Sequence, residues 1–394
     1  MQVVYFFFII FLILLALVIS YLIYAKIMQR NDLRRKKRFE YEMRPIIESH
    51  LQISNELDIP KSEILFIKKK VQTKPGLQVF NDIYFEKLAE NGYDKLLRNY
   101  VRLIIDYQTL YKNRIVHDKY RKSYILYLLA EYYMDSEEVI QLAMSSLEDK
   151  SQFVRNNALR VLRNTGNTEV FLAAYHIISK GKLYFNNKVI VDFIDSFQGD
   201  ILELNRMLAS SIGEFSPQIQ KVIIEHFANR KISEYSSEIL HLIKKSNDKE
   251  VVISGIKFFG MIRYQDAFEF IVEQFDSTNY EVRAVCARAI ALYNCEKTIK
   301  LLEKNITDSN WFVRYNCAFS AISLEKGNEF TQNSLVGKII QGDDVYAKEM
   351  IIYTLYSTQV IDNGNYQEKL AYFLPEKKEE EVEVDVFGNY HPVY

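Results

Sequence analysis

Glycine and proline are scarce in this chain, with 13 and 6 copies among 394 residues. An all-β fold with many tight turns needs both residues, so their shortage argues against that class. Glycine is also too rare for a phosphate-binding loop, and neither GxGxxG nor GxxxxGK[ST] occurs. The supply of Leu, Ile, Lys, Glu, Phe and Tyr instead suits an all-α protein whose helices pack through bulky faces.

Cysteines are also few, and the histidines show no catalytic or metal-binding spacing. The cysteines Cys286, Cys295 and Cys317 are odd in number and form no CxxC, so we expect reduced core thiols in a reducing compartment. The six histidines are scattered, without HExxH or HxH, and no GxSxG is present. We therefore predict no catalytic residues, no metal ligands and no cofactor.

The chain also has no excess of charge of either sign, because the formal net charge is only −1. A balanced chain has no global field that would attract nucleic acid, so we expect no nucleic-acid partner. No small-molecule substrate is evident either. The charges are unevenly placed, with basic residues near the start and acidic residues near the end.

The first 25 residues contain an uncharged stretch from Val3 to Ala25. These 23 residues would form a helix of about 35 Å, enough to cross a bilayer core of roughly 30 Å. No basic segment or small-residue cleavage site of a signal peptide is present. Residues 1–25 are therefore predicted to be a transmembrane anchor, followed by a basic juxtamembrane helix over residues 26–44.

The basic residues lie only after this stretch, at Lys26, Arg30, Arg34, Arg35, Lys36, Lys37 and Arg38. The positive-inside rule then predicts a single-pass protein of the inner membrane with its N-terminus outside and the rest in the cytoplasm. The same residues are candidate contacts to the membrane surface, since each basic side chain near anionic headgroups contributes about 1 kcal/mol. An adaptor that reads anionic lipid is therefore an alternative function.

A repeat dominates the rest of the chain. Taking the arginine after a valine as a reference slot, the slot recurs every 31 to 33 residues at Arg155, Asn187, Gln220, Val252, Arg283, Arg314 and Tyr346. A first column lies four residues further on, at Leu159, Val191, Ile224, Ile256, Ala287, Ala318 and Met350. A second column lies seven residues further on, at Leu162, Ile194, Phe227, Phe259, Ile290, Ala321 and Tyr353. Both columns are apolar or aromatic throughout, which predicts stacked helix pairs, an α-solenoid, over residues 136–374.

Two regions flank the predicted solenoid. Residues 45–135 are predicted to be helical but fall outside the clear register, so they form either degenerate repeats or a separate cap. Pro45 is expected to mark a break in the helix or a new first turn. Residues 375–394 form an acidic and aromatic tail. It is either a solvated end or a linear motif in which Val382, Val384, Val386, Phe387, Tyr390 and Tyr394 bind a partner.

The segments LEDKSQFVRNNALRVL and ITDSNWFVRYNCAFSAI resemble the HEAT repeat in its short bacterial form, also called the PBS-lyase-like repeat. The family kernel D-x4-VR-x2-A-x3-L matches best at Asp149–Leu162 and Asp308–Ala321. The resemblance implies a HEAT-like solenoid of about 220 residues. It also implies polar contacts between successive repeats at Asp149, Arg155, Arg283, Asp308 and Arg314. Asn187, Gln220, Val252 and Tyr346 depart from the pattern, so the ladder is expected to break there.

HEAT folds support many unrelated processes, so the resemblance predicts architecture more than function. We expect a membrane-tethered cytoplasmic scaffold whose solenoid and tail recruit a protein partner, itself associated with the membrane. Single-span proteins of this plan resemble components of envelope or polysaccharide-export systems that work beside a membrane glycosyltransferase. The alternative from a different class is an enzyme subunit or a lyase of the HEAT-like type, whose mark would be a pocket of titratable groups.

Overall fold

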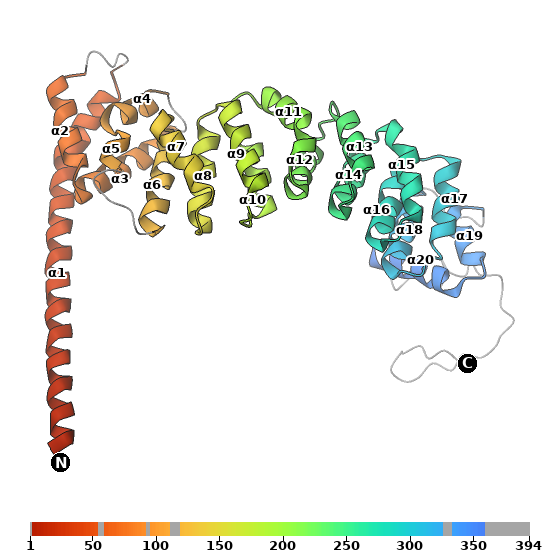
Figure 1. Cartoon of the computed structure of the whole chain (residues 1–394), viewed down its shortest axis with the longest axis horizontal. Helices are drawn as coiled ribbons and strands as arrows, with labels where there is room; N and C mark the ends of the chain where they lie inside the picture. Colours follow the sequence, from red (N-terminus) through yellow and green to blue (C-terminus); the bar gives the residue numbers. More distant parts are fainter. Residues whose placement is uncertain (1, 54–58, 92–94, 111–118, 326–332, 359–394) are drawn as a thin grey trace. The chain divides into compact units, whose positions relative to one another are not determined.

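The computed structural model describes residues 2–53, 59–91, 95–110, 119–325 and 333–358. Every regular element within these residues is helical, which confirms the all-α solenoid class (Figure 1). Contacts divide the chain into two units, residues 1–178 with 197–200 and residues 179–196 with 201–394. Each unit is described by itself below.

The first unit contains helices α1 to α8 and nearly all of α9. Their bounds are α1 Gln2–His50, α2 Lys61–Val71, α3 Lys74–Asn91, α4 Lys95–Ile104, α5 Tyr107–Leu110, α6 Lys119–Glu131, α7 Glu137–Ser146, α8 Gln152–Asn164 and α9 Thr168–Lys180. The C-terminal part of α1 packs on α3, and α2 contacts α1, α3 and α4. Further along the chain, α8 packs against both α6 and α7.

The second unit continues the alternation of inner and outer helices. Its inner helices are α10 Asn187–Asp195, α12 Pro217–Arg230, α14 Lys249–Ile262, α16 Tyr280–Ala289, α18 Trp311–Leu324 and α20 Val345–Ser357. Its outer helices are α11 Ile201–Ser210, α13 Ser236–Lys245, α15 Phe268–Glu273, α17 Glu296–Asn305 and α19 Leu335–Gln341. Each inner helix packs on the next inner helix in the chain, which is the arrangement of a solenoid.

The two columns lie on α8 in the first unit and on the six inner helices of the second unit, each of which packs on the next. All seven residues of the first column are buried, with Val191 and Met350 the most accessible at 4% and 6% exposure. In the second column the first six residues are fully buried, whereas Tyr353 is 51% exposed. The predicted register is thus confirmed for every unit that has a described inner helix after it.

The register also begins earlier than the sequence suggested. Lys122 of α6 lies 33 residues before Arg155, and the residues four and seven further on, Leu126 and Leu129, are both fully buried. Helix α6 packs on α8 as successive inner helices do in the second unit. Part of region 45–135 therefore belongs to the repeat array.

Side-chain caps fix where the inner helices of the second unit begin. Asn186, Asp248, Asn279, Asn310 and Asp344 each accept hydrogen bonds from amides of the first turn. In α12 the N-cap residue Ser216 makes no side-chain cap hydrogen bond, and Pro217 takes the first helical position, where its missing N–H group costs nothing. At α16 and α18 an asparagine therefore caps the helix, which leaves Asp308 of the α17–α18 turn available for another contact.

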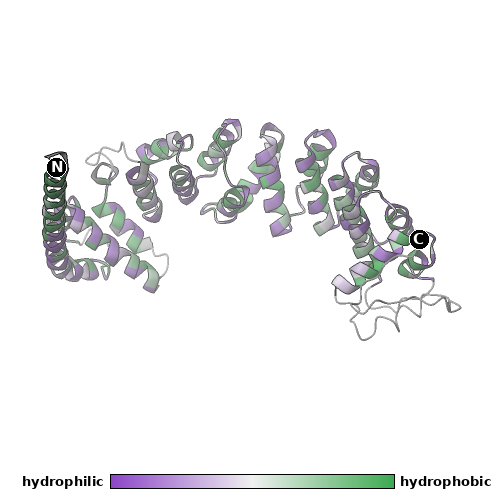
Figure 2. Ribbon diagram, turned by 90° about the horizontal axis from the view of Figure 1, so that it is seen from below, coloured by the Kyte–Doolittle hydropathy of each residue, from purple (hydrophilic) through white to green (hydrophobic). Residues whose placement is uncertain are grey.

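Helix α1 runs unbroken from Gln2 to His50, and the expected break at Pro45 is wrong. The turns around Pro45 are held by packing, because Met43 and Ile47 are buried to 0% and 2% exposure on the side that faces α3. Tertiary contacts of this kind outweigh the local tendency of proline to break a helix. Among the described residues, α1 is the one helix long and apolar enough to cross a membrane, a test that a signal sequence also passes. Its N-terminal end is strongly hydrophobic, whereas the solenoid helices mix both kinds of residue (Figure 2).

Two of the three cysteines are core residues, as expected. Cys286 and Cys317 are fully buried free thiols, and burial raises the pKa of each well above its usual value. The expectation of a core thiol is wrong for Cys295, which is exposed before α17. The buried pair lies at the same position of two successive repeats, where a small side chain lets the inner helices approach.

The buried second column predicts a sharp contrast between two aromatic residues in the same slot. Phe259→Ala should lower the free energy of unfolding by about 3–5 kcal/mol, because it leaves a cavity between inner helices. Tyr353→Ala removes a half-exposed ring and should cost less than about 1.5 kcal/mol. Chemical denaturation of both variants measures the difference. Equal losses of unfolding free energy in the two variants would show that the exposure of a second-column side chain does not determine how much it stabilises the fold.

Candidate functional site

A partly buried ion pair joins two consecutive repeats of the second unit. Arg283 of α16 donates from Nε and Nη2 to both carboxylate oxygens of Asp308, at 2.7 and 3.0 Å. Its remaining nitrogen, Nη1, donates to the carbonyl of Ser277 in the turn before α16, at 2.8 Å. The arginine thus fastens its own turn and the turn of the next repeat, as the predicted polar ladder requires.

The carboxylate of Asp308 is stabilised in its charged form. Burial alone would raise its pKa, but the hydrogen bonds from Arg283 and from the Asn310 amide lower the pKa below its usual value. Arg283 changes in the complementary direction, because the bond to Asp308 raises the pKa of its guanidinium.

A second contact of this type lies in the first unit, where lysine replaces arginine. Asp149 accepts from Lys122 Nζ of α6 and from the Ser151 amide, both at 2.9 Å. Arg155 is buried and donates to the carbonyls of Asp149 and Lys150, at 2.8 and 3.1 Å. Asp149 therefore contacts the preceding inner helix through Lys122, whereas these two hydrogen bonds of Arg155 stay within its own turn. The sequence analysis did not identify Lys122, because the kernel motif has an arginine at this position. The leucines at the two column positions, 126 and 129, are the signal that would have identified it, and both are buried.

Arg314 makes a different contact from Arg283. Its Nε donates to the carbonyl of Asp308, which belongs to its own turn and not to an adjacent repeat. Its guanidinium lies over the ring of Tyr346 on the next inner helix, 5.2 Å from the ring centroid. The counterpart of Asp308 in the next repeat, six residues before Tyr346, is Ile340, so Arg314 meets no carboxylate there and lies against the Tyr346 ring instead.

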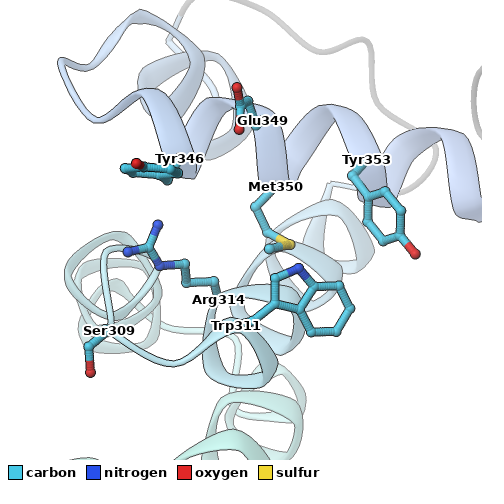
Figure 3. Close-up of a pocket in the computed structure, with 7 residues that line it drawn as sticks. All are labelled: Ser309, Trp311, Arg314, Tyr346, Glu349, Met350 and Tyr353. Atoms are coloured by element: carbon cyan, nitrogen blue, oxygen red, sulfur yellow. The ribbon is translucent and has the colours of Figure 1, made fainter. Parts of the chain in front are cut away.

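A hollow of about 510 Å³ lies between α18 and α20. It is lined by Ser309, Trp311, Arg314, Tyr346, Glu349, Met350 and Tyr353 (Figure 3). The rings of Tyr346 and Trp311 stand on opposite sides of Met350, and the Arg314 guanidinium lies beneath Tyr346 (Figure 3). We call these residues the aromatic hollow.

Ring contacts hold the aromatic hollow in a fixed shape. Trp311 stacks almost parallel on Tyr315, with centroids 5.2 Å apart and planes at 4°. Tyr353 packs its edge against both rings, at 5.9 and 6.2 Å. Trp311, Tyr346 and Tyr353 nevertheless remain 47%, 68% and 51% exposed. The neighbouring Phe312, 54% exposed, stacks on Tyr280 of α16 and extends the aromatic surface along the inner helices.

Sequence reasoning did not single out the aromatic hollow, although two signals were present. The last copy of the repeat carries tyrosine in the reference slot and in the second column. The other copies have arginine, asparagine, glutamine or valine in the slot and leucine, isoleucine, phenylalanine or alanine in the column. The chain's single tryptophan lies three residues before the Arg314 slot. Whether these rings are exposed depends on which segment packs against α20, and periodicity does not reveal this.

The other predicted site residues lie elsewhere. Lys26, Arg30, Arg34, Arg35, Lys37 and Arg38 are exposed on α1, whereas Lys36 is partly buried and pairs with Asp82 of α3 at 2.5 Å. The candidate partner-binding residues Val382, Val384, Val386, Phe387, Tyr390 and Tyr394 lie outside the described residues. In the described part of the chain, no group of three His, Cys, Asp or Glu residues is placed to hold a metal ion.

Comparison with known proteins yields only remote structural likenesses. No protein-family model matches the chain, and no curated protein matches it. An engineered protein of known structure is similar over 63% of this chain and 77% of its own, with 16% identity and a TM-score of 0.34. Human deoxyhypusine hydroxylase, solved with glycerol, is similar over 75% of this chain and 95% of its own, with 11% identity and a TM-score of 0.26.

The Arg283–Asp308 pair predicts a pH-dependent contribution to stability. Because the pKa of Asp308 is lowered by folding, the pair stabilises fully above the unfolded pKa of about 3.9 and is lost as pH falls through the folded pKa. Arg283→Ala should therefore cost about 2–4 kcal/mol at neutral pH and much less near pH 2, measured by denaturant unfolding.

A matched control is available in the adjacent exposed pair. Lys304 and Asp276 lie 3.9 Å apart with side chains 73% and 83% exposed, so Lys304→Ala should change stability by less than about 0.5 kcal/mol. A loss for Arg283→Ala that is the same at neutral and acid pH would contradict the assignment of its contribution to the Asp308 carboxylate.

Proposed function

We propose that this chain is a membrane-tethered, non-enzymatic scaffold of the HEAT-repeat type that recruits a protein partner through the aromatic hollow. The observation that carries the proposal is the exposure of Trp311, Tyr346 and Tyr353 around Arg314. Tryptophan, tyrosine and arginine are the residues that most often dominate the binding energy of protein interfaces. The rings also lie on helices rather than loops, so little conformational entropy is lost on binding.

The lining of the aromatic hollow favours one kind of ligand. Met350 forms an apolar floor that is 6% exposed, and the rings on either side leave room for one aliphatic or aromatic side chain. Arg314 lies at the rim with its guanidinium against Tyr346, where it can also donate hydrogen bonds to a carboxylate of the partner. We infer a polypeptide segment that presents an apolar anchor next to an acidic residue.

Tethering makes such a small site sufficient. The apolar part of α1 is long enough to span a bilayer, and none of its most apolar segment is buried in the protein. Basic residues follow this part of α1 and none precede it, which favours an N-terminus outside and a cytoplasmic solenoid. A partner confined to the same membrane meets the aromatic hollow at high effective concentration, so a weak contact is enough.

The HEAT-like assignment is supported by the contact between Arg283 and Asp308. Arg283 stands at the arginine position of the family kernel in one repeat, and Asp308 stands at the aspartate position in the next. An enzymatic role of the HEAT-like type would need convergent titratable groups in a pocket. The titratable groups that line the aromatic hollow are Arg314, Glu349 and two tyrosines, and in Figure 3 Glu349 points away from Met350 at its floor. The geometry therefore favours binding over catalysis.

Crosslinking in native membranes tests the proposal. A photo-activatable residue at Ser309, on the rim of the aromatic hollow, should capture a specific membrane partner. Trp311→Ala should reduce the yield about tenfold or more, since loss of a hot-spot side chain costs about 2 kcal/mol or more. Phe153→Ala on α8, which removes a 73% exposed aromatic side chain far from the hollow in sequence, is the matched control and should leave the yield unchanged.

Two further arms keep the result unambiguous. Trypsin should digest the solenoid in sealed inside-out vesicles but not in right-side-out vesicles; the reverse pattern would contradict the topology. Because Trp311 is the chain's single tryptophan, its fluorescence reports directly on the aromatic hollow. If removing residues 359–394 exposes Trp311 to a soluble quencher, the chain itself covers the hollow and the proposed partner site is wrong.

A further inference from the structure

Helix α1 carries two distinct faces beyond its apolar part. Residues 26, 30, 34, 37, 38 and 41 recur at spacings of three and four, so they share one face of the helix. Five of them are the exposed cations Lys26, Arg30, Arg34, Lys37 and Arg38, which we call the basic stripe. Tyr41 ends this face and is 84% exposed.

The opposite face of α1 is occupied by the rest of the first unit. Residues 32, 36, 39, 43, 47 and 50 recur at the same spacings, and Met43, Ile47 and His50 among them are buried to 2% exposure or less. His50 Nδ1 lies 3.0 Å from the Tyr100 hydroxyl of α4, and Nε2 lies 2.7 Å from the Glu63 carboxylate of α2. The helices α2 to α4 thus hold α1 on one side only.

Charged contacts add to this attachment near the C-terminal end of α1, and Arg44, seven residues after Lys37, reaches α3 from the edge of the first face. Lys36 pairs with Asp82 of α3, and Arg44 donates to both carboxylate oxygens of Glu86 of α3, at 2.8 and 3.0 Å. Lys70 of α2 donates to Glu42 at 2.7 Å and lies 4.2 Å from the centre of the Phe39 ring. By contrast, the described residues give the basic stripe a single ion pair, Arg38 with Glu42.

We propose that the basic stripe binds anionic phospholipid headgroups, and that this contact tilts α1 so that helices α2 to α4 are turned away from the membrane. The inference rests on the proposed membrane tether and adds the direction in which α1 tilts relative to the membrane. The stripe has no acidic member, and it continues directly from the uncharged stretch that ends at Ala25. An exposed tyrosine among cations is the composition that membrane interfaces favour.

Dimensions explain why tilt is required. The stripe from Lys26 to Tyr41 covers about 22 Å along the helix axis, at a rise of about 1.5 Å per residue. The headgroup layer on one side of a bilayer is only about 5–8 Å deep. An upright helix would place Lys26 and Arg30 there and leave Arg34, Lys37 and Arg38 beyond it. Tilts of up to about 40° occur in transmembrane helices, and the long arginine side chains extend the reach further.

The test uses the full chain in nanodiscs of phosphatidylcholine, with or without phosphatidylglycerol. An environment-sensitive fluorophore is placed by Tyr41→Cys in a Cys295→Ser background, in which the two remaining cysteines are fully buried. The probe should shift to shorter wavelength and lose iodide quenching only when phosphatidylglycerol is present. A probe at Ser49→Cys, also exposed but two turns further on, is the position control and should respond much less.

A charge variant isolates the stripe. Combining Arg30→Gln, Arg34→Gln, Lys37→Gln and Arg38→Gln should return the Tyr41 probe to its value in pure phosphatidylcholine. Each cation near an anionic surface contributes about fivefold in affinity, so partial sets should give graded responses. A Tyr41 probe that is equally exposed in both lipids overturns the inference, while the tether stands if the chain still inserts.

Two other outcomes assign the stripe differently. If a synthetic peptide of residues 376–385 protects the Tyr41 probe in pure phosphatidylcholine, the stripe binds acidic polypeptide and not lipid. If the chain fails to enter either nanodisc, the membrane tether itself is wrong and the lipid inference falls with it.

Discussion

The packing of each inner helix on the next one is the contact on which the rest of the structure depends. A repeat of about 32 residues cannot enclose its own apolar residues, so the two columns are removed from water only where another inner helix covers them. Phe227 and Phe259, fully buried in the second column, show the result. Polar contacts such as Arg283–Asp308 lie at the ends of these helices and fix the register, while the apolar columns supply most of the stability.

The same constraint explains where a binding surface arises. Tyr353 occupies the slot of Phe259, but no described inner helix follows α20, and half of its ring is exposed. Interior repeats use this slot for stability, whereas the last described repeat leaves its rings accessible beside Trp311 and Arg314. An array that gains stability from neighbours thus exposes more aromatic surface at the repeat with no described inner helix after it, and the proposed partner site lies there.

Periodicity was sufficient to predict the columns, because burial between stacked helices demands apolar residues at fixed spacing. It failed at Lys122, where a lysine makes the contact that the family motif assigns to arginine. It failed again at Pro45, whose helix-breaking tendency is offset by the packing of Met43 and Ile47 on the side facing α3. The aromatic hollow was missed for a third reason: exposure of Tyr346 and Tyr353 depends on which segment covers them, and this is not encoded in the repeat.

Function was less accessible than fold, since a solenoid carries no catalytic signature and its partners are selected by surface residues that the repeat does not constrain. The anchor helix shows what structure adds. The sequence places seven cations after the apolar stretch, but only the packing of α1 separates Lys36, which pairs with Asp82, from the exposed members. The direction in which each side chain points around the helix decides which cations are free to meet a membrane.

Native-state hydrogen exchange across the second unit tests most directly whether coverage by the next inner helix is what stabilises each repeat. Helices α14 and α16, each packed between two inner helices, should exchange most slowly and at similar rates. Helix α20 packs on α18, with no inner helix described after it, and should exchange much faster. Protection of α20 equal to that of α14 would contradict the account, because stability would then not depend on a following repeat.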